Sequence, residues 1–420
     1  MRDQRLLPRF RGLSSLYLNG TALTGSSALT AGLGFVFWVV IARRTDQATV
    51  GSAGVVISAL TGLSAIAQVG LGGVLVTYLP TAGPRSRNLI LLAYGGAAAA
   101  ALLLAAGFVL AMPVFFPSVT VLHSRPATLF FVLSVAVWSI FALQDSVLTG
   151  LRQAVYIPVE NAVYGIAKLA AVSLVGSLTA WSILLSWVVP AAILTVPVSI
   201  LLLRHLLPRH TTMPVKVKPL DGWRAYLARD TAGLLFAQGL TVALPVLVLS
   251  RLGAESAGAF AVVWMLSQTL DLLSINMGMS LTVEGVHDQD RLPAMLRQLR
   301  VRIVPLVCLV AAVGAAAAPF LLALFGQGYA ASGAATLAVL LLGSALKSFS
   351  ILSMYAARAR RDSKLILRIQ VIQTSVTLVG TLFLAEWLGL AGVGVAYVLA
   401  QICAVVFLLT RRAGESIWAR

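Results

Sequence analysis

The chain has 420 residues and a formal net charge of +17, yet only 11% of its residues are charged and 59% are hydrophobic. Soluble domains usually contain about 25% charged residues, so a chain with a mean hydropathy of +0.93 has too little polar surface for a water-soluble protein. This composition excludes a cytosolic globular enzyme, a disordered chain and a nucleic-acid-binding domain. It predicts an all-α polytopic membrane protein in contact with the lipid bilayer.

Long apolar runs predict where the chain crosses the membrane. A bilayer core about 30 Å thick is spanned by roughly 20 apolar residues in a helix. Twelve runs of about this length are found, at residues 18–42, 50–79, 89–112, 127–150, 154–178, 181–203, 230–250, 257–284, 303–325, 333–356, 365–386 and 390–410.

The basic residues predict the orientation of these spans. With twelve spans, both termini lie on the same side of the membrane. If that side is the cytoplasm, 25 of the 31 Lys and Arg residues face inward, whereas Arg43, Arg44, Arg125 and Arg251 face outward. Because Lys and Arg accumulate in cytoplasmic loops, we predict a multi-pass protein of the cell membrane with both termini in the cytoplasm.

The longest polar segment, residues 204–229, separates six spans from six spans. It contains three prolines and several basic residues, a composition typical of a linker. We therefore predict an N-terminal six-helix lobe over residues 1–203 and a C-terminal six-helix lobe over residues 230–420.

A repeated spacing indicates that the two lobes are related. Arg44 and Gly51 follow the first span as Arg251 and Gly258 follow the seventh, at a constant offset of 207 residues. An even number of spans in each repeat preserves the chain direction, so the offset predicts parallel repeats related by an axis along the membrane normal.

Several short motifs support a family resemblance. They are Ile41-Ala42-Arg43-Arg44 with Val50-Gly51, Ala67-Gln68-Val69-Gly70-Leu71-Gly72, Tyr78-Leu79-Pro80, and Leu148-Thr149-Gly150-Leu151-Arg152. In these motifs and in span spacing the chain resembles polysaccharide flippases of the multidrug/oligosaccharidyl-lipid/polysaccharide exporter superfamily, although fourteen spans are frequent there. The resemblance implies two lobes around a central cavity that opens alternately to either side. It also implies that a lipid-linked oligosaccharide passes from the inner to the outer leaflet.

Charged side chains inside the spans are the first candidates for contact with a cargo, because each costs about 2.5–3.5 kcal/mol to insert on translocon scales. They are Asp145, Glu160, Lys168, Asp271 and Lys347. Asn161 and Lys168 are seven residues apart and so share one face of the fifth span.

Two interpretations of these residues remain open. In the first, Asp145, Glu160, Asn161 and Lys168 form a polar wall in which Lys168 meets a phosphate or a sugar hydroxyl, and Asp271 and Lys347 act likewise in the second lobe. In the second, Lys168 with Glu160 and Lys347 with Asp271 are structural ion pairs between packed helices.

The seventh span adds Arg229, Asp230 and Gln238. Hydroxyl side chains in membrane helices often only bond the backbone or hold helices together, but these three side chains are larger. The resemblance places the first and seventh helices along the cavity, which makes the three residues cavity candidates. The two cysteines and four histidines have no metal-binding spacing, so we expect neither a metal nor another cofactor.

The leading hypothesis is a flippase without enzymatic activity. Its expected partners are a lipid-linked glycan, the bilayer, and a polymerase or glycosyltransferases of polysaccharide or lipopolysaccharide biosynthesis. The first alternative is a cation-coupled multidrug antiporter that uses Asp145, Glu160 or Asp271. A membrane glycosyltransferase is the second, but the outer loops carry only isolated Asp46 and Glu255 in place of paired carboxylates. A scaffold of a biosynthetic complex is the third.

Overall fold

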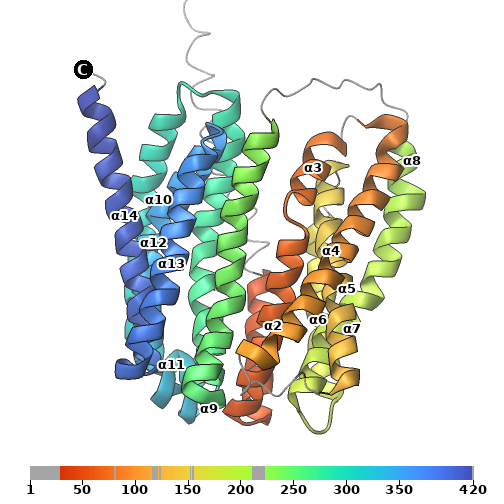
Figure 1. Cartoon of the computed structure of the whole chain (residues 1–420), viewed down its shortest axis with the longest axis vertical. Helices are drawn as coiled ribbons and strands as arrows, with labels where there is room; N and C mark the ends of the chain where they lie inside the picture. Colours follow the sequence, from red (N-terminus) through yellow and green to blue (C-terminus); the bar gives the residue numbers. More distant parts are fainter. Residues whose placement is uncertain are drawn as a thin grey trace, which may run out of the picture. The chain divides into compact units, whose positions relative to one another are not determined.

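The computed structural model describes residues 29–79, 82–115, 124–151, 156–210 and 223–418, together with Leu122 and Gln153. Some side chains within these ranges, including those of residues 223–230 and 412–418, are not described. Every regular element in the described ranges is a helix (Figure 1).

The elements of the N-terminal half are residues 29–44, α2 (Gln47–Ala67), α3 (Leu71–Tyr78), a 3-10 turn (Gly83–Arg85), α4 (Ser86–Phe115), α5 (Arg125–Gly150), α6 (Tyr156–Leu174), α7 (Ala180–Ile200), a π-helical turn (Leu201–Leu206) and α8 (Leu207–His210). Those of the C-terminal half are α9 (Trp223–His287), α10 (Leu292–Ala316), α11 (Ala318–Ala323), α12 (Gln327–Ala359), α13 (Ser363–Leu388) and α14 (Leu390–Trp418). Helix α9 is two helices joined at Gly253, whose φ of 83° favours glycine.

Each of the twelve predicted spans corresponds to a helical segment. Among the described residues, nine helices are long and apolar enough to cross a membrane, and one of them, Thr231–Thr282, contains the kink at Gly253 and therefore two spans. The other two spans are residues 29–44, described only from residue 29 onward, and α6, whose polar residues lower its hydropathy. The prediction of an all-α polytopic membrane protein with about twelve transmembrane helices is confirmed.

Two predicted spans are wrong as continuous helices. Helix α2 ends at Ala67 and α3 begins at Leu71, because Gly70 has a left-handed φ of 82° that turns the chain. The ninth span is likewise divided between α10 and α11.

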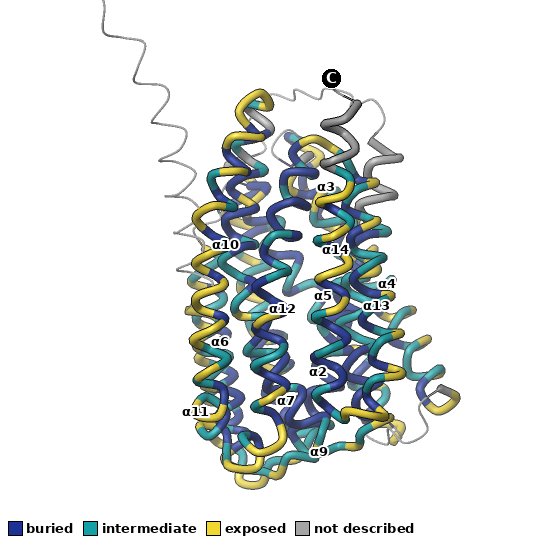
Figure 2. Tube along the Cα trace, turned by 90° about the vertical axis from the view of Figure 1, so that its left-hand side faces the viewer, coloured by how far each residue is buried: buried dark blue, intermediate teal, exposed yellow. Residues whose placement is uncertain are grey.

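Large apolar side chains cover the outer sides of the helices. On α4, for example, Leu92, Leu103 and Leu110 are 73%, 75% and 77% exposed. Exposed and buried residues alternate along individual helices in Figure 2. Apolar surface of this extent needs an apolar environment, which the hydrocarbon core of a bilayer provides.

The chain divides into two units. The first, here called the N unit, is Leu33–Ala261, and the second, the C unit, comprises Val262–Arg420 with Met1–Gly32. In the N unit, a core made mainly of leucines joins α3, α4, α5 and the π-helical turn. In the C unit, α12 packs against α10 and α14, and α13 packs along α14. The boundary lies inside α9, so the lobes predicted over 1–203 and 230–420 stay a prediction.

A close crossing in the N unit repeats the offset of 207 residues. A methyl group at Gly51 in α2 would collide with the backbone of Ala254 and Gly258 in α9, and one at Gly258 would collide with the backbone of Gln47. Adding 207 to Gln47 and Gly51 gives Ala254 and Gly258, so the contact is the same in both directions. This reciprocity supports the predicted parallel repeat.

Candidate functional site

Lys168 of α6 lies in a cage of three aromatic rings, here called the Lys168 cage. Its Nζ is 4.0 Å from the ring centre of Trp187 and 5.1 Å from the ring centres of Phe37 and Tyr164. Lys168 is only 6% exposed. The rings come from the helix at residues 29–44, from α7 and from α6 itself, so three helices of the N unit build the cage.

Further aromatic contacts hold these rings in place. Trp138 of α5 lies 5.9 Å from Trp187 and 5.6 Å from Tyr164, measured between ring centres. Phe141 lies 5.2 Å from Tyr164. The hydroxyl of Tyr164 donates a 3.1 Å hydrogen bond to the carbonyl oxygen of Trp187, which ties α6 to α7. The cage is therefore built into the packed core of the N unit.

The charge of Lys168 is only partly stabilised by the rings. Burying an ammonium group costs several kcal/mol after relaxation, while a desolvated cation–π contact returns about 2 kcal/mol, and contacts at 5.1 Å return less. Among the described residues no carboxylate pairs with Lys168. An anionic group would supply the missing stabilisation.

The ion pair between Lys168 and Glu160 that the sequence left open is not found among the described residues. Eight residues along one helix correspond to a rise of about 12 Å, which separates the two charged groups. Glu160 is 7% exposed, and both of its carboxylate oxygens are buried without a hydrogen-bond partner among the described residues.

Asp145 and Asn161 lie close to Glu160 at the predicted cytoplasmic end of the N unit. The side chains of Asn161 and Asp145 are close enough to interact, and the charge of Asp145 acts on Glu160. Tyr94 of α4 is also electrostatically coupled to Glu160. The structure thus brings together three of the four residues predicted for this lobe and places Lys168 apart from them.

In the C unit, Asp271 of α9 and Lys347 of α12 form an ion pair. The distance from Lys347 Nζ to Asp271 Oδ2 is 2.7 Å, and the side chains are 20% and 3% exposed, respectively. Lys347 also donates a 3.4 Å hydrogen bond to Gln268 and lies 5.7 Å from the ring centre of Tyr397. These contacts agree with the structural pair that the sequence left open.

The structure says less about the three candidates of the seventh span, Arg229, Asp230 and Gln238. Arg229 and Asp230 are in α9, but their side chains lie outside the described residues. Gln238 is half-buried in α9, and its backbone carbonyl oxygen, not its side chain, lies near Gly62 of α2. Within the described part of the chain, no group of three or more His, Cys, Asp or Glu residues is placed to hold a metal ion.

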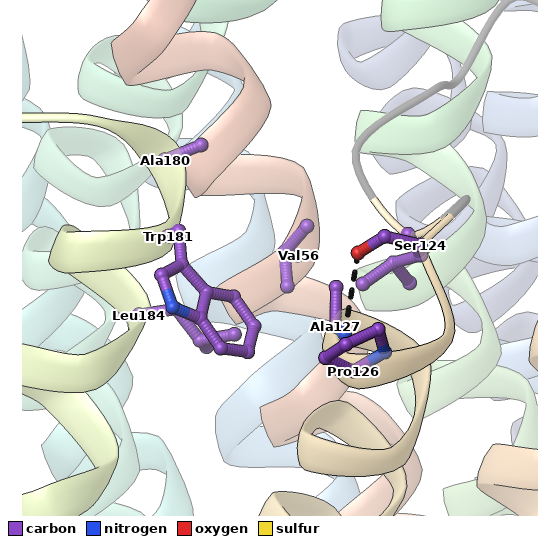
Figure 3. Close-up of a pocket in the computed structure, with 8 residues that line it drawn as sticks. Val56, Ser124, Pro126, Ala127, Ala180, Trp181 and Leu184 are labelled. Carbon is purple, nitrogen blue, oxygen red and sulfur yellow. Dashed lines mark hydrogen bonds between the residues drawn. The ribbon is translucent and has the colours of Figure 1, made fainter.

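A cavity of about 290 Å³ lies at the predicted outer end of the N unit, and none of the predicted site residues lines it (Figure 3). Trp181 faces Pro126 across it, and the Ser124 hydroxyl accepts a hydrogen bond from the Ala127 amide. Its walls are mainly apolar, so it offers no charge to a ligand.

The sequence did not reveal the aromatic residues of the cage or Trp138, which packs against two of them. Phe37, Trp138, Tyr164 and Trp187 all lie within predicted spans, where an aromatic residue cannot be distinguished from ordinary core. Their positions relative to Lys168 depend on contacts between helices far apart in the chain. Only Tyr164, four residues before Lys168 and so on the same helix face, carried a local signal.

Comparison with known proteins identifies the fold. No family model and no curated protein match the sequence. An inward-facing multidrug resistance MATE family transporter of the MOP superfamily is similar in structure, with a TM-score of 0.70 and 13% identity over 94% of this chain and 95% of that chain. An outward-facing transporter of the same description has a TM-score of 0.65 and 12% identity over 96% of each chain.

A third similar structure is a MOP superfamily transporter from Pyrococcus furiosus, for which a reversed polarity of the binding pocket suggests a different function. It has a TM-score of 0.67 and 13% identity, over 97% of this chain and 96% of that chain. The chain therefore has the fold of MATE transporters of the MOP superfamily, and the proteins that it resembles are transporters rather than enzymes.

Proposed function

We propose that this protein is a transporter, not an enzyme, that flips a lipid-linked oligosaccharide or polysaccharide repeat unit from the inner to the outer leaflet by alternating access. The similar structures include inward-facing and outward-facing transporters, which supports alternating access. The observation that carries the choice of cargo is the Lys168 cage. It combines a buried cation that has no carboxylate partner in the described part of the chain with three aromatic faces.

The head group of a lipid-linked glycan has the matching chemistry. Its phosphate is anionic and takes charge-assisted hydrogen bonds from an ammonium group. Its sugar rings have apolar C–H faces that pack on aromatic rings, while the sugar hydroxyls remain polar. Binding sites typically combine aromatic walls with a few convergent polar groups in this way. The lipid tail would remain in the bilayer while the head group moves.

The crossing of α2 and α9 at Gly51 and Gly258 suggests how one side of the path closes. These helices belong to the first and second repeats and meet at the predicted outer end. Opening to the outside requires the two small-residue surfaces to separate. At Gly51 and Gly258 the backbones of the two helices face each other directly, and this close fit makes the closed contact specific.

A cation-coupled multidrug antiporter is the second candidate function. It is favoured by Asp145 and Glu160, whose carboxylates are close enough to interact. The carboxylate of Glu160 accepts no hydrogen bond from the described residues. A proton or cation bound there would stabilise the pair. A positive charge at Lys168 would, however, repel a cationic drug, and for this reason we prefer the glycan.

A glycosyltransferase is not favoured. Asp46, one of the two isolated outer carboxylates, accepts hydrogen bonds from the amide and the hydroxyl of Thr49, both at 2.8 Å, and caps α2. Its role is therefore structural. For the flippase, we further propose the cell membrane as its location, with cytoplasmic termini, and a polymerase or glycosyltransferases as partners.

The test is reconstitution into liposomes with a panel of fluorescent lipid-linked sugar phosphates, with the leaflet accessibility of each probe measured over time. We expect wild type to flip at least one of them and Lys168→Met to be about tenfold or more slower, because a charge-assisted hydrogen bond contributes about 1.5–3 kcal/mol. Lys364→Met is the matched control. Lys364 is exposed near the start of α13, so its substitution removes the same charge without touching the cage.

Two results would change the assignment. Equal flipping by wild type and Lys168→Met would remove the cage from the cargo path. Failure of wild type with every probe, combined with export of cationic dyes that is lost in Glu160→Gln, would favour the antiporter.

A further inference from the structure

A second cavity, whose wall is more polar than that of the first, lies in the C unit at the predicted cytoplasmic end, and neither Asp271 nor Lys347 lines it. It has a volume of about 90 Å³ and is lined by residues from α10, α12, α13, α14 and the turn between α12 and α13. A water needs roughly 10–15 Å³ of cavity volume, so the space takes several waters or one phosphate group. We call it the arginine pocket, after Arg300, Arg360 and Arg411 in its wall.

Two of the three arginines are held in fixed positions. The guanidinium of Arg300 donates a 2.6 Å hydrogen bond to Ser353 and lies 4.0 Å above the ring centre of Phe349. Arg411 pairs with Asp362 at 3.1 Å. A planar guanidinium whose orientation is already fixed loses less entropy when it binds an oxyanion.

Asp362, the one carboxylate among the described residues of the wall, already has partners on both of its oxygens. One oxygen of Asp362 accepts the Leu365 amide at 3.1 Å and caps α13, while the other accepts from Arg411. Among the described residues of the wall, three arginines and one aspartate give a net charge of +2. The cavity is therefore ready for an anion rather than for a cation.

The turn between α12 and α13 places Arg360 at the pocket. The amide of Asp362 donates to the Ala357 carbonyl at 2.8 Å and that of Arg361 donates to the Arg358 carbonyl at 3.0 Å, the hydrogen bonds of a Schellman C-cap. Arg361 takes the left-handed position with φ 59° and does not line the cavity. This neighbour has the same charge and serves as a control.

The apolar part of the wall indicates the rest of the ligand. Leu296, Leu365 and Leu408 line the cavity beside the arginines, and the neighbouring Val301 and Leu409 are 67% and 51% exposed. Basic pockets between helices on the cytoplasmic side bind anionic lipid head groups. An anionic phosphate attached to an acyl chain fits such a wall.

We propose that the arginine pocket binds the phosphate of an anionic lipid head group from the inner leaflet, with Arg300, Arg360 and Arg411 as its ligands. Free inorganic phosphate has the same binding chemistry and is the other source. Binding at this site is separate from cargo transport, so it is tested without a transport assay.

The experiment measures ligand binding to the purified full chain in mixed micelles. Phosphatidylglycerol, phosphatidylcholine and inorganic phosphate are titrated separately, and bound ligand is followed by native mass spectrometry and by the melting temperature. We expect saturable binding of phosphatidylglycerol and much weaker binding of phosphatidylcholine, whose choline cancels the phosphate charge.

The variants identify the pocket. We expect Arg300→Gln and Arg360→Gln each to weaken phosphatidylglycerol binding about fivefold, the equivalent of about 1 kcal/mol for one arginine near an anionic lipid. Arg361→Gly, which removes the adjacent charge, should bind as wild type does. Because Arg360 is exposed, its variant remains informative even if Arg300→Gln fails to fold.

The three ligands and the variants together distinguish a lipid head group from free phosphate and show which result would contradict the site. Free phosphate is supported as the ligand if inorganic phosphate binds as tightly as phosphatidylglycerol and its binding is weakened equally by Arg300→Gln and Arg360→Gln. Phosphatidylglycerol binding that exceeds it would support the lipid. Equal binding by wild type and both glutamine variants, or an equal loss in Arg361→Gly, would overturn the site.

Discussion

Breaking the ion pair between Asp271 and Lys347 separates a structural role from a role in transport. At 2.7 Å and an effective dielectric constant of 20, their Coulomb attraction is about 6 kcal/mol. Removing two ions from water costs several kcal/mol each, so the intact pair contributes little net stability. Each charge left alone, however, is costly.

The expected pattern follows from these magnitudes. Asp271→Leu or Lys347→Met alone should destabilise the protein by about 3–5 kcal/mol, because each leaves one buried charge without its partner. The double variant should be close to wild type, since it replaces the pair by apolar side chains of similar volume. Because the double variant recovers the cost of both single variants, the coupling free energy between the two positions should be about 6–10 kcal/mol in magnitude.

The assay is SDS-driven unfolding in mixed micelles, followed by tryptophan fluorescence. Gln373 and Gln401 of the same unit provide a matched neutral pair, with a 2.7 Å hydrogen bond between buried side chains. Leucine at both positions should show a coupling of only about 0.6–1.7 kcal/mol.

Two results would refute this reasoning. Single variants that each cost less than about 1 kcal/mol, with a coupling no larger than that of the glutamine pair, would show that the charges are solvated. A double variant that unfolds like wild type but has lost transport would show that the pair acts on the cargo as well as on the fold.

Three further predictions concern helix ends and crossings. Gly51→Ala should lower the free energy of unfolding by about 1–3 kcal/mol, because its methyl group would lie 2.5 Å from a backbone nitrogen in α9. The control Gly107→Ala, whose methyl group would have nothing within 4 Å, should stabilise α4. Unfolding in mixed micelles compares the two variants, and equal effects would contradict the close crossing of α2 and α9. The hydrogen bonds from Thr49 lower the pKa of Asp46 below 3.8 in the folded protein, so its stabilisation of α2 is present above pH 3.8 and is lost as pH falls through the lowered value. The cost of Asp46→Ala should accordingly shrink below about pH 4. Thr179, which caps α7 with an uncharged hydroxyl, provides the control, since the cost of Thr179→Ala should not change with pH. A cost of Asp46→Ala that is independent of pH would count against the charged cap. Arg361→Gly should raise the free energy of unfolding by about 1 kcal/mol, since glycine adopts a φ of 59° without strain. A lower melting temperature would show that contacts of the Arg361 side chain stabilise the fold by more than this strain costs.

The sequence was sufficient to predict the membrane spans because the hydrophobic effect acts on whole runs of residues. Length and hydropathy alone located all twelve helical segments, and helix geometry placed Asn161 and Lys168 on one face. The break at Gly70 was harder to predict, since a glycine in an apolar run also serves close packing. The left-handed φ of Gly70 shows which role applies.

Pairing between helices could not be predicted in the same way. Glu160 and Lys168 are close in sequence, but the helical rise separates them. Asp271 and Lys347 are 76 residues apart and nevertheless form the 2.7 Å pair. Such contacts depend on how helices pack, and continuous apolar runs do not encode the partner of each helix.

The comparison of Lys168 with Lys347 shows how the environment, rather than the residue type, indicates a function. Both ammonium groups lie within predicted membrane spans and near aromatic rings. Lys347 has a carboxylate at 2.7 Å, so its charge is neutralised within the fold, and an anionic ligand there would have to displace Asp271. Lys168 has no carboxylate partner among the described residues, so an anion that reaches it replaces no existing ion pair. For this reason an anionic cargo should depend on Lys168 far more than on Lys347, whose removal acts first on stability.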